Sequence, residues 1–402
     1  MRAALARAAR RGSGTAGRAP QRASTRAARS SKRFHVTLAR SRIARRAAAL
    51  AFTALTACLH DVYRIDDPAP APPSGPAEAR VLVIGDFGLD TTLQRLVARA
   101  IRAESRARPF DLAVQLGDNL YYCGPDPTRP AAEGCRFAPD GSTVAPGYEP
   151  PADPLFRVNE EPLQRLRSRD GGQLPVYLAL GNHDIGWGGG RCAVQGLPDG
   201  EAARRRACLE VAHRSPAWTM PGRHYVVDRG PLRLVVVDTN VVVADYGGFT
   251  LEDEVEFVRA ATVGCGAGRF CFLAGHHPPA AVHGYGRSAR PWPHGERMAR
   301  LLAAAGGRAV GFLAGHVHTL EHLSLGPLDV FISGSTAMGG FARFRWQVPA
   351  AARPHFVTNA WGYAVLEADA AGWRFRFRGV DGEDLYCCAA GREGPCAPVE
   401  CR

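Results

Sequence analysis

The fold is decided by the stretch Val81-Leu82-Val83-Ile84-Gly85-Asp86-Phe87-Gly88, in which four apolar residues run into a glycine and an aspartate. A short apolar run that ends in glycine is typical of a buried parallel strand meeting its loop. The same pattern returns at Gly117-Asp118-Asn119-Leu120-Tyr121, Gly181-Asn182-His183-Asp184, Gly275-His276-His277-Pro278 and Gly315-His316-Val317-His318. Because open α/β sheets gather ligands at the carboxyl ends of their strands, the five motifs predict one shared site.

One such motif carries little weight alone, because Gly-Asp pairs are frequent in turns and a lone histidine is more often a core or surface residue. Five motifs in a fixed order, each after an apolar run, are poorly explained by chance. Their side chains are carboxylates, an amide, a phenol and imidazoles, which together can hold two adjacent metal ions. We therefore predict a dinuclear metal site.

The segments around the motifs alternate between strand-like and helix-like patterns, which predicts β-α-β crossovers and, after the third motif, one antiparallel hairpin. Helices are expected at 91–106, 158–169 and 251–262. Strands are expected at 80–85, 111–117, 175–181, 224–228, 232–238, 270–275, 328–333, 361–368 and 373–379. This order fits an α/β fold of two packed mixed β-sheets flanked by helices, in four layers α/β/β/α.

Two insertions, residues 123–157 and 187–222, directly follow ligand motifs. Both are rich in glycine and proline, and each contains two cysteines. Long loops of this kind in a compact domain are usually functional or cross-linked. We expect them to form walls of the substrate pocket.

The charge of the chain is concentrated at its start. Residues 1–50 hold 13 arginines, one lysine and no acidic residue, so the remaining 352 residues carry −2 of the total +12. A nearly neutral body gives no electrostatic support to nucleic-acid binding, and we expect no nucleic-acid partner.

The basic leader fits a nucleic-acid arm, a transit peptide or the head of a secretory signal. The uncharged residues 47–57 are too few to span a bilayer and have the length of a signal-peptide core. They end at Leu55-Thr56-Ala57-Cys58, which resembles the lipobox of bacterial lipoproteins and implies a lipid on Cys58. An ordinary signal peptide, a start at Val36, and export in the folded state through Arg45-Arg46 stay as alternatives.

The predicted organisation has four parts. Residues 1–58 form the leader and lipoprotein-type signal, 59–79 a Pro-rich linker, 80–382 the catalytic domain and 383–402 a Cys-rich tail. We expect an exported monomer, periplasmic or at the cell surface, whose only membrane attachment is the lipid on Cys58.

Cysteine usage supports export. Besides Cys58 there are ten cysteines, in close groups away from the five motifs, which suits local disulfides in an oxidising compartment. The expected pairs are Cys123–Cys135, Cys192–Cys208 and Cys265–Cys271, with four cysteines left in the tail. A zinc site is less favoured, because the spacings are irregular.

The motif order resembles the calcineurin-like metallophosphoesterases, and within them the small tartrate-resistant type of purple acid phosphatase. The resemblance covers roughly residues 80–340. Most of that superfamily has a histidine where this chain has Gly88; purple acid phosphatases have instead a tyrosine three residues after the second aspartate, where Tyr121 stands.

The resemblance implies a metal site residue by residue. The first metal would be held by Asp86, Asp118, Tyr121 and His318, and the second by Asp118, Asn182, His276 and His316. Carboxylates and a phenolate suit Fe(III), and the uncharged ligands suit Fe(II), Zn or Mn. The alternative for Tyr121 is a core aromatic residue.

The resemblance also implies the activity, which is hydrolysis of small phosphate monoesters at acidic pH. A metal-bound hydroxide would attack phosphorus in line, while His183 and His283 bind substrate and protonate the leaving group. His283 could instead be a plain surface residue, and Asp184 could orient His183 or belong to a turn. The alternatives are a phosphodiesterase or nucleotidase on the same metals, or a non-catalytic surface protein that binds metal or a partner.

Overall fold

The computed structural model describes residues 62–64, 79–266, 269–282, 294–339 and 351–401. The predicted leader with Cys58, most of the Pro-rich linker, and His283 lie outside these ranges. Within them, no helix is long and apolar enough to cross a membrane.

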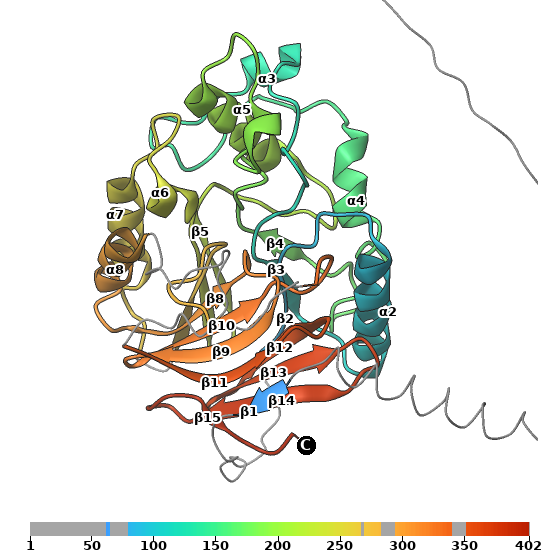
Figure 1. The fold of residues 1–402 in the computed structure, drawn as a ribbon, viewed down its shortest axis with the longest axis vertical. Helices are drawn as coiled ribbons and strands as arrows, with labels where there is room; N and C mark the ends of the chain where they lie inside the picture. The colour runs from blue at the N-terminus through green and yellow to red at the C-terminus, as the bar shows by residue number, and fades with distance from the viewer. Residues whose placement is uncertain (1–61, 65–78, 267–268, 283–293, 340–350, 402) are drawn as a thin grey trace, which may run out of the picture. The chain divides into compact units, whose positions relative to one another are not determined.

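One of the two central sheets has seven strands (Figure 1). They are β2 (Ala79–Ile84), β3 (Leu112–Gln115), β4 (Val176–Leu178), β12 (Gly362–Ala368), β13 (Trp373–Gly379), β14 (Asp384–Ala390) and β15 (Ala397–Pro398). The order is β15-β14-β13-β12-β2-β3-β4, and the pairs β2–β3 and β3–β4 are parallel. The remaining pairs are antiparallel, so the sheet is mixed.

The other sheet has eight strands. They are β1 (Val62–Arg64), β5 (Tyr225–Arg229), β6 (Leu232–Val236), β7 (Phe270–Ala274), β8 (Ala309–Ala314), β9 (Leu320–Leu325), β10 (Leu328–Ser333) and β11 (Ala352–Thr358). The order is β1-β11-β9-β10-β8-β7-β6-β5, with a parallel centre of β6, β7, β8 and β10. The predicted hairpin is confirmed as β5 and β6.

Aromatic side chains pack the two sheets against each other. Phe331 of β10 stacks on Phe375 of β13 with ring centroids 3.9 Å apart, and Phe272 of β7 meets Trp373 edge to face at 5.0 Å. All four side chains are buried. The apolar runs before the motifs are largely buried as well, and every residue of β2 and β7 is buried, as expected for strands covered on both faces.

Helices cover the outer sides of the sheets. Helix α2 (Thr92–Ala107) begins at Thr91, whose hydroxyl accepts the Gln94 N–H at 3.0 Å, and it contacts β12. Helices α7 (Leu251–Ala261) and α8 (Gly295–Ala304) pack on each other, beside the short α6 (Asn240–Val243), across the sheets from α2 (Figure 1). The predicted fold class is confirmed.

Two predicted boundaries differ from the structure. Instead of a helix over 158–169, α4 (Arg157–Glu160) ends before Pro162, whose ring and missing N–H do not fit a helix interior. The seven-stranded sheet also continues past Gly382, because β14 pairs along β13. The segment predicted as a tail therefore contributes strands to the domain.

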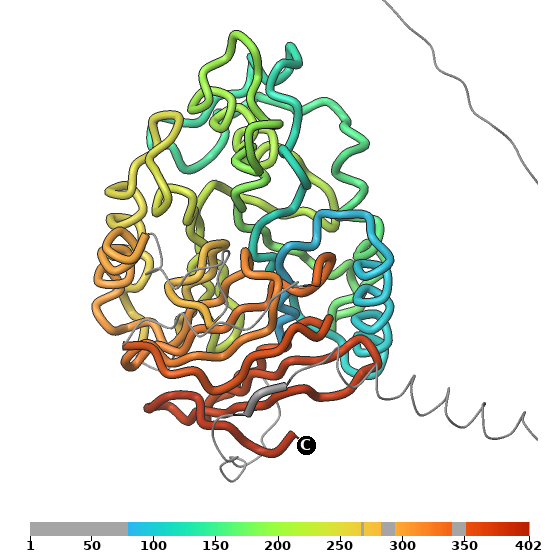
Figure 2. Tube along the Cα trace, viewed as in Figure 1, coloured from blue at the N-terminus to red at the C-terminus, as the bar shows by residue number. Residues whose placement is uncertain are grey.

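The two insertions lie side by side. The first contains α3 (Pro130–Gly134) and η1 (Pro154–Phe156), and the second contains η2 (Gly190–Cys192) and α5 (Asp199–Ala212). Helix α3 packs on α5, at the end of the domain drawn at the top of Figure 2.

Disulfides cross-link the insertions to each other rather than closing each on itself. The bonds are Cys123–Cys192 and Cys135–Cys208, so the predicted pairs Cys123–Cys135 and Cys192–Cys208 are wrong. The error came from pairing neighbours in sequence, whereas folding brings the insertions together. The tail cysteines pair as Cys387–Cys401 and Cys388–Cys396.

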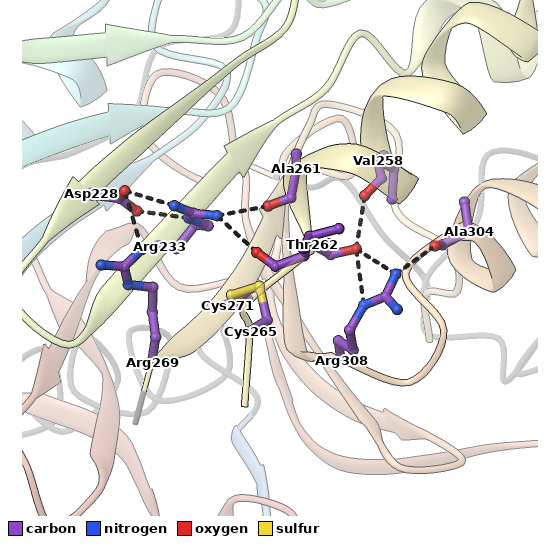
Figure 3. The surroundings of a disulfide bond; sticks show 11 residues. Asp228, Arg233, Val258, Ala261, Thr262, Cys265, Arg269, Cys271, Ala304 and Arg308 are labelled. Carbon is purple, nitrogen blue, oxygen red and sulfur yellow. Dashed lines mark hydrogen bonds and ion pairs between the residues drawn. A yellow bond between two sulfur atoms is a disulfide. The ribbon is translucent and has the colours of Figure 1, made fainter. Parts of the chain in front are cut away.

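The predicted Cys265–Cys271 bond is confirmed and ties the turn after α7 to β7 (Figure 3). Beside it, Arg233 donates to the Ala261 carbonyl at 3.0 Å and pairs with Asp228 at 2.8 Å. These contacts fix α7 to the edge of its sheet, away from the five motifs.

Candidate metal centre

The structure brings the five motifs together where the two sheets meet. Asp86, Asp118 and Asn182 lie in the loops after β2, β3 and β4 of the seven-stranded sheet. His276 and His316 lie in the loops after β7 and β8 of the eight-stranded sheet. The carboxyl ends of parallel strands from both sheets therefore face one site, as the sequence predicts.

Asp86, Tyr121 and His318 form one group of possible ligands. The Tyr121 hydroxyl lies 3.0 Å from Asp86 Oδ1 and 3.4 Å from His318 Nε2. His318 Nε2 is also 3.4 Å from Asp86 Oδ1. The three donor atoms thus lie within 3.4 Å of one another.

Asn182, His276 and His316 form a second group. Asn182 Oδ1 lies 2.9 Å from His276 Nε2 and 3.0 Å from His316 Nδ1, and these two nitrogens are 3.1 Å apart. The other nitrogen of His276, Nδ1, lies 2.9 Å from the Leu116 carbonyl, which fixes the ring orientation.

Asp118 lies between the two groups. Its Oδ1 is 3.4 Å from His276 Nε2, and Asp86, Asp118 and His276 place ligand atoms within 4.8 Å of one another. Burial alone would raise the pKa of Asp118, but the neighbouring His276 and His183 outweigh it and the pKa is lowered. Asp118 is therefore an anion at the centre of the site.

Three of these residues adopt a backbone conformation that side chains rarely take. Their φ angles are 56° at Asp86, 52° at Asp118 and 67° at His316. Residues other than glycine seldom occupy the left-handed region, and such outliers cluster at functional sites. The local backbone is thus shaped to turn these side chains toward each other.

The glycines of the motifs permit this crowding. Gly117 has a φ of 82°, and a Cβ there would come within 2.7 Å of His276 Nδ1. At Gly181 a Cβ would overlap the backbone of Asp118. A side chain at either position would push apart the loops that hold the site.

The electrostatics of the site fit a cation. Burial, and then Asp118 and Asp86, raise the pKa of Tyr121 well above its usual range. Burial, and then His276, lower the pKa of His316 well below its usual range. The donor set consists of carboxylates, a phenol, an amide oxygen and imidazoles in close contact, a composition that is found at transition-metal sites.

His183 lies at the edge of this group. Its backbone N–H donates to Asp118 Oδ1 at 2.9 Å, and its Nε2 is 3.9 Å from Asp118 Oδ2. The ring Nδ1 lies 2.7 Å from the Tyr122 carbonyl. Because a carbonyl only accepts, Nδ1 carries hydrogen and Nε2 is the nitrogen free to face a substrate.

Two neighbouring side chains lie beside the candidate ligands. Asp184 accepts the N–H groups of Leu120 at 2.9 Å and Gly181 at 2.6 Å, so it joins two ligand loops rather than orienting the His183 ring. His277 is buried, with Nδ1 3.0 Å from the Thr239 hydroxyl and its ring 4.6 Å from that of His316. It is a packed neighbour of the site.

Sequence reasoning missed Glu210 of α5, which is fully buried beneath the site. Asn119 donates Nδ2 to Asp184 Oδ2 at 3.0 Å and to Glu210 Oε2 at 3.2 Å, so two carboxyl groups share one amide. Burial and Asp118 raise the pKa of Asp184 to about 7, and burial and Asp184 raise that of Glu210 well above its usual range. The run of helix-forming residues around Glu210 signals a helix, but its burial becomes visible only in the fold.

Several solved structures are similar to the chain. One is GAP50, the anchor in the inner membrane complex of Plasmodium, with a TM-score of 0.54 and 16% identity over 81% of this chain and 90% of that chain. Another is the purple acid phosphatase PPD1 from yellow lupin (Lupinus luteus) seeds, with a TM-score of 0.51 and 15% identity. The match covers 78% of this chain and 53% of the lupin chain. At such identities these likenesses show the fold alone.

Sequence comparison gives the family. No curated protein matches the chain. The model of the calcineurin-like phosphoesterases matches residues 79–320, which begin with β2 and include all five motifs. The ligand-bearing loops thus lie within the matched region, and the chain belongs to the calcineurin-like phosphoesterase family.

Proposed function

We propose that this phosphoesterase hydrolyses phosphate monoesters at two metal ions. Asp86, Asp118, Tyr121 and His318 would hold the first, and Asp118, Asn182, His276 and His316 the second. The observation that carries the proposal is the position of Asp118 between two separate donor groups. Two carboxylates and a phenolate suit Fe(III), and the uncharged second set suits Fe(II), Zn or Mn.

The metal pair, when bound, would neutralise phosphoryl charge and lower the pKa of a coordinated water toward ~7. The protein supplies the geometry, because the ligand loops are joined through Asp184 and Asn119 and cannot drift apart independently. Asp118 also accepts the His183 N–H, which keeps this histidine beside the residues that would hold the metals.

His183 would bind the phosphoryl group and protonate the leaving oxygen. The Tyr122 carbonyl accepts the Nδ1–H, so the atom of the ring that can donate a proton to the leaving oxygen is Nε2. His283 is proposed to share this role by its resemblance to the second substrate histidine of the purple acid phosphatases.

The cross-linked insertions are proposed as the pocket wall. Tyr122 is 42% exposed and precedes the Cys123–Cys192 bond, and its ring lies 5.9 Å from that of His183. An aromatic surface fixed beside the acid would contact the leaving group of a bound ester.

The test is metal analysis of the purified protein combined with hydrolysis of alkyl monoesters, aryl monoesters, diesters and nucleotides from pH 4 to 9. We expect about two metal ions per chain and monoester hydrolysis that is fastest at acidic pH. A preference for diesters or nucleotides would replace the monoesterase proposal by a phosphodiesterase or nucleotidase on the same site.

A second candidate is a non-catalytic surface role. It is motivated by the likeness to GAP50, which is described as an anchor. The assembled donor set speaks against it, because an anchor has no need of two ligand groups around one carboxylate. A fully metal-loaded protein with no hydrolysis of any ester would favour the anchor.

Export is part of the proposal. Five disulfides indicate folding in an oxidising environment. We propose a periplasmic or surface location with a lipid on Cys58. The mass of the mature N-terminal peptide tests the lipid, and an unmodified terminus elsewhere would rule it out.

A further inference from the structure

The near-neutral charge of the domain conceals one strongly basic surface. Along α2, Arg95, Arg99, Arg102 and Arg106 follow a spacing of four, three and four residues, which places them on one face of the helix. Arg99 and Arg106 are exposed, and Arg102 is half-buried.

Three more arginines complete this surface from α4 and the chain after it, namely Arg157, Arg165 and Arg167. Two cavities of about 570 and 470 Å³ lie between this segment and α2. Both are lined by Arg102 and Glu161, so they adjoin each other along the helix. We call the arginine surface the six residues Arg99, Arg102, Arg106, Arg157, Arg165 and Arg167.

Within the part of the chain that the structure describes, carboxylates compensate the charge of the arginine surface only in part, because Glu160 lies near Arg157 and Glu161 lines both cavities. There, ion pairs join Arg95 to Asp90 and Arg378 to Asp384, but no ion pair joins any of the six arginines to a carboxylate. Glu161 and Asp90 are the acidic residues that line the cavities. Burial, and then Arg106, Arg165 and Arg99, lower the pKa of Arg102, as expected where guanidinium groups crowd one another.

We propose that the arginine surface binds a linear chain of phosphate groups, of the kind found in inorganic polyphosphate. Guanidinium groups match phosphate oxygens with paired N–H donors, and a row of them suits a repeating anion. The row from Arg99 to Arg106 extends over roughly 10 Å of helix at ~1.5 Å per residue, which is enough to contact several groups at once.

The shape and composition of the surface favour this ligand over an anionic membrane and over single-stranded nucleic acid. The cavities are concave, whereas an anionic membrane presents a flat plane of headgroups. Their linings contain no aromatic side chain on which bases could stack, which single-stranded nucleic acid would use. The lining therefore has guanidinium groups that can bind phosphate but no aromatic side chain that could stack on bases.

The arginine surface is built on the loops that carry the metal centre. Gln94, which lines one cavity, donates Nε2 to the Phe87 carbonyl at 2.8 Å and to the Val158 carbonyl at 2.7 Å. Asn159 donates Nδ2 to the Asn119 carbonyl at 3.0 Å. A bound chain would thus lie beside the loops of Asp86 and Asp118, although its binding does not depend on hydrolysis.

The experiment compares two triple variants of the full chain that remove the same charge. Arg99→Gln/Arg106→Gln/Arg165→Gln alters the arginine surface, and Arg136→Gln/Arg259→Gln/Arg392→Gln alters exposed arginines elsewhere. The basic leader is identical in both. Binding of inorganic polyphosphate of one defined length is measured by calorimetry at several salt concentrations.

We expect the first variant to bind polyphosphate about ten-fold more weakly. The slope of log affinity against log salt concentration should be shallower by roughly 2. The control should bind like the wild type, and both should hydrolyse a small aryl phosphate normally. Equal losses in the two variants, or no loss in the first, would overturn the proposal. The proposal would also be overturned if the wild type bound oligothymidylate or anionic phosphatidylglycerol vesicles more tightly than polyphosphate, and if the first variant lost that preference.

Discussion

The Asp86 carboxylate accepts the backbone N–H of His316 at 2.8 Å, across 230 residues of sequence and between the two sheets. The carboxylate that we assign to one metal therefore also positions the loop of a ligand assigned to the other. Metal occupancy and the packing of the two sheets should depend on each other for this reason.

Replacing Asp118, the proposed bridging ligand, should reduce metal binding at both proposed sites. In Asp118→Asn the central anion is lost while the size of the side chain is kept, so we expect metal content to fall at both sites. Asn182→Ala removes a ligand of the second group alone and should deplete mainly that metal. Elemental analysis of the two variants distinguishes them, and a normal metal content with full activity in Asp118→Asn would refute the ligand assignment.

Tyr121 predicts a colour. A phenolate bound to Fe(III) gives a charge-transfer band, so the oxidised protein should absorb broadly in the visible. Tyr121→Phe keeps the ring and removes the donor oxygen, and the band should vanish while the thermal midpoint changes little. A colourless wild type with a full iron content would remove Tyr121 from the proposed ligand set.

The sequence predicted the parts of the fold that depend on local patterns. In each motif an apolar strand, a glycine and a polar residue follow one another in the sequence, so Asp86 and His316 could be predicted as site residues. The structure brings their two motifs together. The partner of Cys123 could not be found in this way, because it lies 69 residues away in another insertion. Strands such as β9 were missed because some of their polar residues find partners on other strands: His322 lies 3.1 Å from Asp329 of β10 and 2.8 Å from the Tyr386 hydroxyl of β14.

The Cys123–Cys192 bond should matter for activity as well as stability. It follows Tyr122, whose carbonyl orients His183. Cys123→Ser/Cys192→Ser should lose stability by about 2–5 kcal/mol and should also lower kcat. The matched control Cys265→Ser/Cys271→Ser, which lies away from the motifs, should lose stability while kcat is retained.

Both pairs of variants are compared by urea unfolding and by steady-state kinetics at a temperature where each is folded. An equal loss of kcat in the two would mean that the bond acts on stability alone.

The buried carboxyl pair predicts a pH dependence of stability. Asp184 and Glu210 hold protons in the folded state at pH values where unfolded carboxyls, with pKa near ~4, have lost them. The folded state then binds more protons, so stability should be greatest at low pH and fall as pH rises toward and past about 7. Glu210→Gln resembles the protonated form and removes the like charge beside Asp184, so this decline should flatten.

The free energy of unfolding, measured by urea titration from pH 5 to 9, tests this expectation. Glu256→Gln is the control, because Glu256 is an exposed carboxylate of α7. If Glu210→Gln keeps the wild-type slope, the pair does not hold a proton in the folded protein.

His183 should act as an acid whose importance depends on the leaving group. General acid catalysis typically contributes about 10²–10⁴-fold, and an alkoxide needs this help far more than an aryl oxide does. His183→Ala should therefore reduce kcat strongly on alkyl phosphates and weakly on aryl phosphates. His183→Gln places a polar group near the Tyr122 carbonyl but has no acidic proton, so it should show the same selective loss.

The pH profile separates this role from simple positioning. A general acid must hold its proton to donate it, so a fall in wild-type activity on alkyl phosphates as pH rises that is due to this acid should disappear in both variants. Recovery of activity in His183→Gln, or equal losses on the two substrate types, would show that His183 holds the phosphoryl group in place without donating a proton. The leaving oxygen would then take its proton from His283 or from water.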